Sequence, residues 1–340
     1  MFIGFLLVAA ATLTVGVLFA AFYLADGMTR SKRNRVQGTP GDLGLRYEEV
    51  QFLTADRLTL RGWFLESPGA RATVVLVHDL EATRADPAHG LLNLTRDYVR
   101  RGISVFTFDL RGHGESAGRR DSFGTNERLD VLAAVAFVRR RSGAQPVLLH
   151  GFGFGAALGI AAAARNTDVT AVIADSSFLT MRQYLRSRWR NVPAPLFALA
   201  TVFAHRIFHA DVEALQPVKS IAQVTAPVLL IHNEGDERVP VAHSLNLAAA
   251  VQVACYELRV AHTGGSVWSA PRFAPATTDE IAALDTHAER TLVAMSFLNP
   301  RLPRRLMPRL RRLFARAGLE KEEVNILRGI LARIDDVMRR

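Results

Sequence analysis

The chain has 340 residues, 49% of them hydrophobic, which is enough for one large core, and its single cysteine, Cys255, excludes an internal disulfide and a cysteine-based metal site. The net charge of +10 lies at the two ends, because residues 301–340 hold twelve basic and five acidic groups whereas residues 36–300 are neutral overall. This distribution favours attachment to an anionic surface over a nucleic-acid-binding core, so we expect no nucleic-acid partner, and we expect no metal or cofactor.

The first predicted element is an apolar stretch from Phe2 to Leu24 that contains no charged residue. At about 1.5 Å per residue, a helix of this length crosses a hydrocarbon core of roughly 30 Å. A cleaved signal peptide is the alternative, but the stretch lacks a basic start and a small-residue cleavage site. We predict a single-pass membrane anchor at 1–25 and a basic juxtamembrane linker at 26–45. Because Arg30–Arg35 is basic, the positive-inside rule predicts a cytoplasmic body.

Strand-like and helix-like segments alternate through the next part of the chain. A hairpin-like pair of alternating segments is followed by short apolar runs typical of strands buried on both faces. Amphipathic helical spacing separates several of these runs. The strand-like runs are 72–78, 103–110, 146–149, 169–175, 227–231 and 254–260. This order predicts a mostly parallel sheet covered by helices on both faces.

Four motifs occur at the ends of these runs: VVLVH at 74–78, FDLRGHGES at 108–116, GFGFGAA at 151–157 and LLIHNEGDERVP at 229–240. Together they resemble the serine α/β-hydrolase superfamily, in particular its membrane-anchored esterase, lipase and peptidase-like branch. The resemblance spans residues 46–300. It implies an α/β-hydrolase fold with an eight-stranded, mostly parallel sheet and catalytic loops at the carboxyl ends of the strands.

The same resemblance makes residues 178–222 a cap over the site. Trp189, Phe197 and Phe203 are among its apolar residues, which could line a pocket for an acyl-like small molecule. They could equally pack on the body of the domain.

In this family the middle residue of the glycine-rich turn is a nucleophilic serine, and here that position is Gly153. Glycine has no side chain, so no covalent acyl intermediate can form there. The flanking Gly151 and Gly155 still permit the sharp turn. The acid of the family's triad falls on Asp236, which matches the family pattern.

The two remaining elements of the family's site depart from its pattern. By spacing the histidine base is expected at Gly265, and His262, a weak candidate, lies three residues too early. The oxyanion hole would use the backbone N–H groups of Phe154 and Leu80. Before Leu80 the family's glycine is replaced by Asp79, and a carboxylate there would oppose developing negative charge.

These departures favour a catalytically inactive pseudo-hydrolase with a binding or scaffolding role. The alternative is an active esterase-like or lipase-like hydrolase with an unconventional nucleophile, for which Ser176 and Ser177 are the nearest candidates. A minor alternative is dinucleotide binding, because Gly151-x-Gly153-x-x-Ala156 fits a G-x-G-x-x-A turn. Parallel strands that precede this turn, and the bulky phenylalanines within it, argue against a pyrophosphate site.

The carboxyl-terminal segment 301–340 is predicted to form basic amphipathic helices. Residues 301–316 interleave seven arginines with leucines, a pattern that suits an anionic leaflet, so membrane lipid is the expected partner of this helix and of the anchor. A helix packed on the body is the alternative. Residues 320–340 carry apolar residues at three- and four-residue spacing, which permits docking on the body or self-association.

Overall fold

The computed structural model describes residues 1–233, 235–236, 239–250, 276–295, 298, 306–317 and 321–338. The chain forms two compact units, Met1–Glu257 and Leu258–Arg340. The expected strand at 254–260 and the candidates His262 and Gly265 lie outside the described residues.

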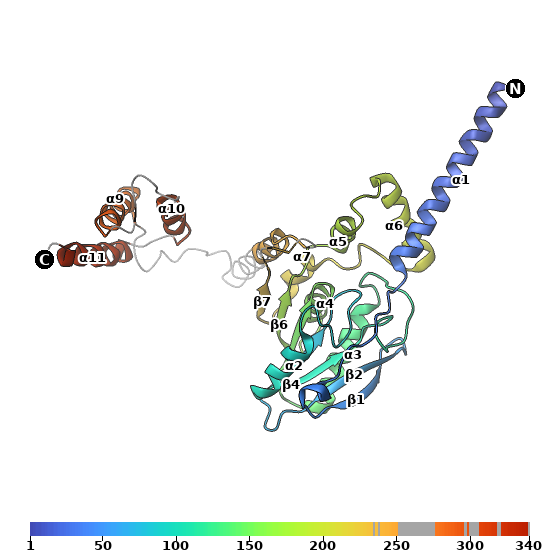
Figure 1. Ribbon diagram of the computed structural model, residues 1–340, viewed down its shortest axis with the longest axis horizontal. Helices are drawn as coiled ribbons and strands as arrows, with labels where there is room; N and C mark the ends of the chain where they lie inside the picture. The colour runs from blue at the N-terminus through green and yellow to red at the C-terminus, as the bar shows by residue number, and fades with distance from the viewer. Residues whose placement is uncertain are drawn as a thin grey trace, which may run out of the picture. The chain divides into compact units, whose positions relative to one another are not determined.

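The first unit contains one long helix, a seven-stranded sheet and the helices around it (Figure 1). The segment expected to form a cap, hereafter called the cap, contains the helices α5 (Met181–Arg188), α6 (Ala194–Phe208) and α7 (Pro217–Ser220) and is followed by the short turn η2 (Ile221–Gln223). The other elements are α1 (Phe2–Thr29), η1 (Pro40–Leu43), β1 (Glu48–Leu53), β2 (Thr59–Leu65), β3 (Thr73–Val77), α2 (Leu91–Arg100), β4 (Ser104–Phe108), α3 (Glu127–Ser142), β5 (Val147–Phe152), α4 (Phe154–Ala163), β6 (Val169–Asp175) and β7 (Val228–Ile231).

The strands follow the order β1-β2-β4-β3-β5-β6-β7. The two pairings made by β2 are antiparallel, and the pairings from β4 to β7 are parallel. The described sheet is therefore mixed and has seven strands, whereas the sequence led us to expect eight. The antiparallel part arises because β1 and β2 form a hairpin whose second strand joins the edge of the parallel part.

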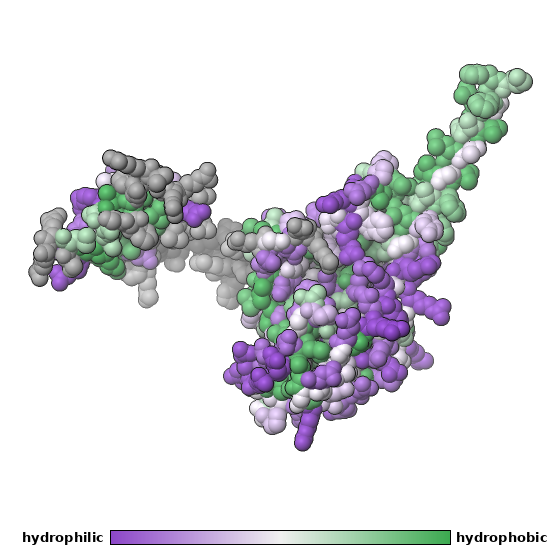
Figure 2. All heavy atoms as spheres, viewed as in Figure 1, coloured by the Kyte–Doolittle hydropathy of each residue, from purple (hydrophilic) through white to green (hydrophobic). Residues whose placement is uncertain are grey.

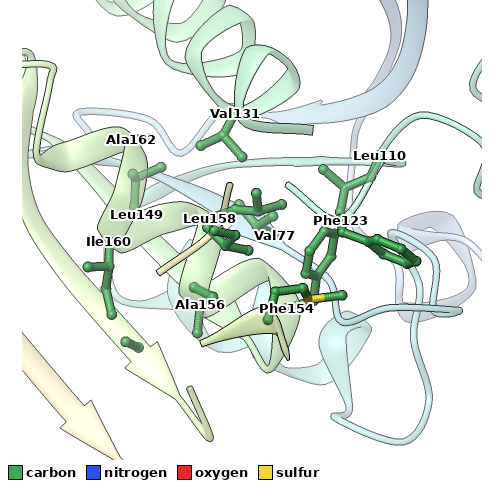
Figure 3. Packing of buried hydrophobic residues seen from close by; sticks show 14 of the residues in the cluster. Val77, Leu110, Phe123, Val131, Leu149, Phe154, Ala156, Leu158, Ile160 and Ala162 are labelled. Atoms are coloured by element: carbon green, nitrogen blue, oxygen red, sulfur yellow. The ribbon is translucent and has the colours of Figure 1, made fainter. Parts of the chain in front are cut away.

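The two central strands are buried on both faces, as their apolar sequences predict. Every residue of β3 and β4 is buried. On one face Val77 belongs to the same cluster as Leu149 of β5 and Val131 of α3, and Figure 3 shows Phe154 and Leu158 of α4 packed in this cluster. On the other face Val74 and Leu76 pack with residues of α2. Alternation of side chains along a strand supplies both layers.

Helix α1 is 28 residues long and has a mean hydropathy of 2.4 over its most apolar window, none of which is buried. By length and composition it is a candidate membrane span. Its last turns are different, because Ala21, Ala25 and Met28 are buried. Figure 1 shows this end of α1 beside α6, and the rings of Phe22 and Phe208 lie 5.7 Å apart. The cap and the end of α1 therefore pack on each other.

The second unit contains three described helices, α9 (Thr278–Ala294), α10 (Leu306–Ala317) and α11 (Lys321–Met338). Met307 and Leu310 of α10 share an apolar cluster with Ala288 of α9 and Leu331 of α11. Asp335 of α11 accepts hydrogen bonds from three side chains of α9, those of His287, Arg290 and Thr291. The apolar side of α10 is thus used within its own unit.

Candidate functional site

The candidate site lies where three neighbouring parallel strands end. In the sheet Val77 of β3 is paired with Gly151 of β5, and Phe152 of β5 is paired with Asp175 of β6. The loops that follow these strands therefore meet at one edge of the sheet, which is where open α/β sheets bind their ligands.

The turn between β5 and α4 has the backbone of a nucleophile elbow. Gly153 has a φ of +51°, and its N–H donates to the carbonyl of Asp175 over 2.8 Å. A Cβ atom on Gly155 would lie 2.3 Å from the carbonyl oxygen of Val77, so α4 can approach β3 this closely only because residue 155 is glycine. The strand–turn–helix geometry expected from the sequence is present.

The side chain of Asp79 lies at the two backbone amides where the family pattern would place an oxyanion. One of its carboxylate oxygens, Oδ1, accepts hydrogen bonds from the N–H of Leu80 and the N–H of Phe154, each over 2.7 Å. These are the two amides that the family pattern assigns to the oxyanion hole. The structure brings them together, but both donate to a side chain of the protein itself.

Asp79 also takes the space that a side chain at position 153 would need. A Cβ atom built on Gly153 would lie 2.2 Å from Oδ1 of Asp79 and 2.4 Å from its Cγ. Real Cβ atoms essentially never approach other atoms so closely. The glycine at 153 and the aspartate at 79 are therefore sterically linked, because the first makes room for the second.

Both the main-chain carbonyl and the side chain of Asp79 make hydrogen bonds with neighbouring residues. Burial raises the pKa of Asp79 above its usual value, and the two amide hydrogen bonds oppose that rise. The ring of His78 bonds the Asp79 carbonyl through Nδ1 over 2.7 Å and accepts from the N–H of Leu110 through Nε2 over 3.0 Å. Burial lowers the pKa of His78 to about 3, so this ring is neutral at pH 7.

A histidine that the sequence did not single out lies in the same loop. Nδ1 of His89 and Oδ2 of Asp86 are 2.5 Å apart, and the His89 ring lies 5.0 Å from that of Phe152. The hydrogen bond to Asp86 raises the pKa of His89, and the charges of Asp79 and Asp175 add to the rise. The acid–histidine spacing in DPAHG was the sequence signal for this pair.

The remaining candidates make local contacts. Oδ1 of Asp236 accepts from the N–H of Val239 over 2.9 Å, as a turn-capping aspartate does, and its Oδ2 lies 3.8 Å from Nε2 of His232. The hydroxyl of Ser176 bonds Asp175 over 3.0 Å, and Ser177 is buried. Among the described residues, no three histidine, cysteine or acidic side chains are grouped so that they could hold a metal ion.

In comparisons with known proteins, the two units resemble different classes of protein. Residues 68–216 match the family described as serine aminopeptidase, S33. Two crystal forms of the esterase Pf2001 from Pyrococcus furiosus resemble the chain with TM-scores of 0.56 and 0.55 at 22% identity. Each likeness covers 66% of this chain and 85% of the esterase. The first unit thus has the α/β-hydrolase fold. A sequence identity of 22% to the esterase supports similarity of fold and nothing about activity.

Residues 279–340 match the family described as tRNA methyltransferase TrmJ, C-terminal domain. The tRNA (cytidine/uridine/adenosine-2'-O-)-methyltransferase TrmJ of Pseudomonas aeruginosa is 44% identical in an alignment 112 positions long, which covers 28% of this chain and 41% of the relative. TrmJ of Cronobacter sakazakii is 36% identical in an alignment 143 positions long, which covers 35% of this chain and 58% of the relative. The chain therefore spans less than two thirds of the curated relatives that it matches.

This similarity contradicts our expectation that the chain has no nucleic-acid partner, because residues 279–340 resemble part of enzymes that act on tRNA. The error came from interpreting the basic carboxyl-terminal segment as a membrane-binding surface. Net charge alone cannot distinguish the phosphates of an anionic leaflet from those of RNA. The packing of Leu306 and Leu310 inside the helical unit also removes two of the leucines on which leaflet binding depended.

The steric link between positions 79 and 153 gives a first prediction. We expect Gly153→Ser to destabilise the protein by about 1–3 kcal/mol, because it crowds Asp79 and places a Cβ atom at a positive φ. In the double variant Asp79→Gly/Gly153→Ser the crowding is gone, so the two effects should be non-additive by about 0.5–3 kcal/mol. Urea unfolding of the two single variants and the double variant measures this coupling. Gly153→Ala controls for the hydroxyl group, because it adds only the Cβ atom. Strictly additive changes in the free energy of unfolding would contradict a steric link between residues 79 and 153.

The His89–Asp86 pair gives a second prediction, on pH. Because the folded-state pKa of His89 is raised, its contribution to stability is complete below about pH 6.5 and is lost as the pH rises through the folded-state pKa. His89→Gln should remove this part of the pH dependence, whereas His205→Gln, at an exposed position, should not. Free energies of unfolding measured from pH 5 to pH 9 test this, and parallel profiles for wild type and His89→Gln would refute it.

Proposed function

We propose that the first unit is a hydrolase-fold module that binds or scaffolds at a membrane and does not hydrolyse acyl substrates. The observation that carries this proposal is the carboxylate of Asp79, which accepts both oxyanion-hole amides over 2.7 Å and takes the space of a side chain at 153.

The free-energy cost of stabilising an oxyanion at this site supports a non-hydrolytic function. Loss of a single oxyanion-hole donor typically costs an enzyme about 2.7–4 kcal/mol of transition-state stabilisation, and here both donors are already used. A second negative charge about 4 Å from an ionised Asp79 would be repelled by about 4 kcal/mol at an effective dielectric constant of 20. With no side chain at Gly153, nothing at the elbow can form the covalent intermediate in the first place.

The membrane part of the proposal is that α1 is a single-pass anchor and that the body is cytoplasmic. The exposed, uncharged surface of residues 2–20 of α1 supports this, together with the basic residues Arg30, Lys32, Arg33 and Arg35 that follow the helix.

A serine-directed fluorophosphonate probe tests the non-hydrolytic proposal. We expect no labelling of the full-length protein in detergent under conditions in which a known serine esterase is labelled completely. Gly153→Ser alone should also remain unlabelled, since the crowded Asp79 carboxylate would still lie beside the new hydroxyl and oppose negative charge developing there. Labelling of the wild type that is abolished by Ser176→Ala or Ser177→Ala would instead establish the active-hydrolase alternative.

A second function is favoured for the carboxyl-terminal unit, which we infer binds tRNA. Its support is the similarity of residues 279–340 to the C-terminal domain of tRNA methyltransferases and the excess of basic over acidic groups in residues 301–340. Arg309 and Arg328 are exposed on α10 and α11, where phosphates could reach them. Basic side chains on a helical scaffold bind such phosphates and release counterions.

The tRNA proposal predicts a salt-sensitive complex. The double variant Arg309→Ala/Arg328→Ala should weaken binding of full-length protein to tRNA and make the dependence of affinity on salt shallower, because fewer counterions are released. Electrophoretic mobility shifts at several salt concentrations measure both quantities. Arg100→Ala, an exposed arginine of the first unit, is the control for net charge. Binding that is unaffected by the double variant, or no binding at low salt, would exclude this surface.

A further inference from the structure

A crevice between α1 and the cap is a further candidate site. The last turns of α1 are fixed on α6, where the ring of Phe22 lies 6.4 Å from Phe203 and 5.7 Å from Phe208. Toward the amino terminus of α1, an open crevice of about 860 Å³ lies between α1 and the start of α6. This volume is within the range of ligand-binding pockets.

The walls of the crevice are apolar. One wall is the stretch of α1 from Ala9 to Ala20, and the other is Pro193, Pro195 and Leu196 at the start of α6. Thr12 is the polar side chain among the described lining residues, and its hydroxyl already donates to the carbonyl of Val8 within the helix over 2.9 Å. Water in such a crevice would find few hydrogen-bond partners, so an apolar occupant fits it better.

Charged groups are found at the opposite end of this helix pair. The guanidinium of Arg120 lies 4.1 Å above the ring of Phe208 and pairs with Asp26 over 2.6 Å. Arg30 pairs with the other oxygen of Asp26 over 2.8 Å. Along α1 the order is therefore apolar crevice first and ion pairs second, which is the order from hydrocarbon to headgroups in a leaflet.

We propose that acyl chains of membrane phospholipids fill this crevice, so that the cap is a second membrane contact beside α1. The proposal rests on the membrane anchoring proposed above, because one wall of the crevice is the spanning helix itself and the lipid around that helix is continuous with the crevice. Figure 2 shows the hydrophobic surface of α1 continuing onto the neighbouring part of the cap. Val202 and Ile207 of α6 are also exposed and extend this apolar surface.

Spin labelling of the full-length chain in phospholipid nanodiscs tests the proposal. In a Cys255→Ser background, single variants Leu196→Cys and Leu13→Cys carry a nitroxide on each wall of the crevice. Leu7→Cys reports on the exposed surface of α1, and Arg100→Cys reports on a water-exposed site of the body. Power saturation measures the accessibility of each label to oxygen, which partitions into lipid, and to a water-soluble nickel chelate.

We expect the oxygen-to-nickel ratio at residues 13 and 196 to match that at residue 7 and to exceed that at residue 100 several-fold. A ratio at residue 196 equal to that at residue 100 would mean that water fills the crevice, and low accessibility to both reagents would mean that protein covers it. Either result overturns the proposal. If residue 7 is itself open to nickel, the anchor has failed, whereas failure at residue 196 alone leaves the anchor intact.

Discussion

The two hydrogen bonds that Asp79 accepts from Leu80 and Phe154 are the contacts on which the candidate site depends. They join the loop after β3 to the first turn of α4, and they satisfy an amide that the helix leaves unpaired at its start. The carboxylate can lie there only because residue 153 has no side chain. The glycine at 153 and the buried carboxyl group at the two amides are therefore one structural arrangement with two parts. On the proposed function, Asp79 takes the place of the oxyanion that an active hydrolase would stabilise.

The loop that carries Asp79 is held by distant parts of the chain. The carbonyl of Glu81 accepts from the side chain of Asn34, which follows α1, over 2.5 Å, and the Glu81 carboxylate accepts from Arg188 of the cap over 2.7 Å. The N–H of Glu81 donates to His113 over 3.0 Å. The segment after α1, the cap and the loop after β4 thus all bond Glu81. These three contacts together fix the loop that carries Asp79.

The second unit illustrates how one sequence pattern can fit two functions. Alternating arginines and leucines in 301–316 suit an anionic leaflet as well as a packed helix with an RNA-facing surface. The choice depends on whether the apolar side is free. In the structure Met307 and Leu310 of α10 pack with α9 and α11, whereas Arg309 and Arg311 of α10 are exposed.

Features with a local cause could be predicted from the sequence alone: the apolar helix α1, the buried strands β3 to β6, the glycine turn around Gly153 and the lack of a nucleophile there. Each depends on neighbouring residues, through periodicity, glycine geometry or a missing side chain. Tertiary structure decided the rest. The bond between Asp79 and Phe154 joins residues 75 positions apart, and the packing of α6 on α1 joins segments still further apart. No local pattern encodes such contacts, because they exist only once the sheet order has brought the loops together.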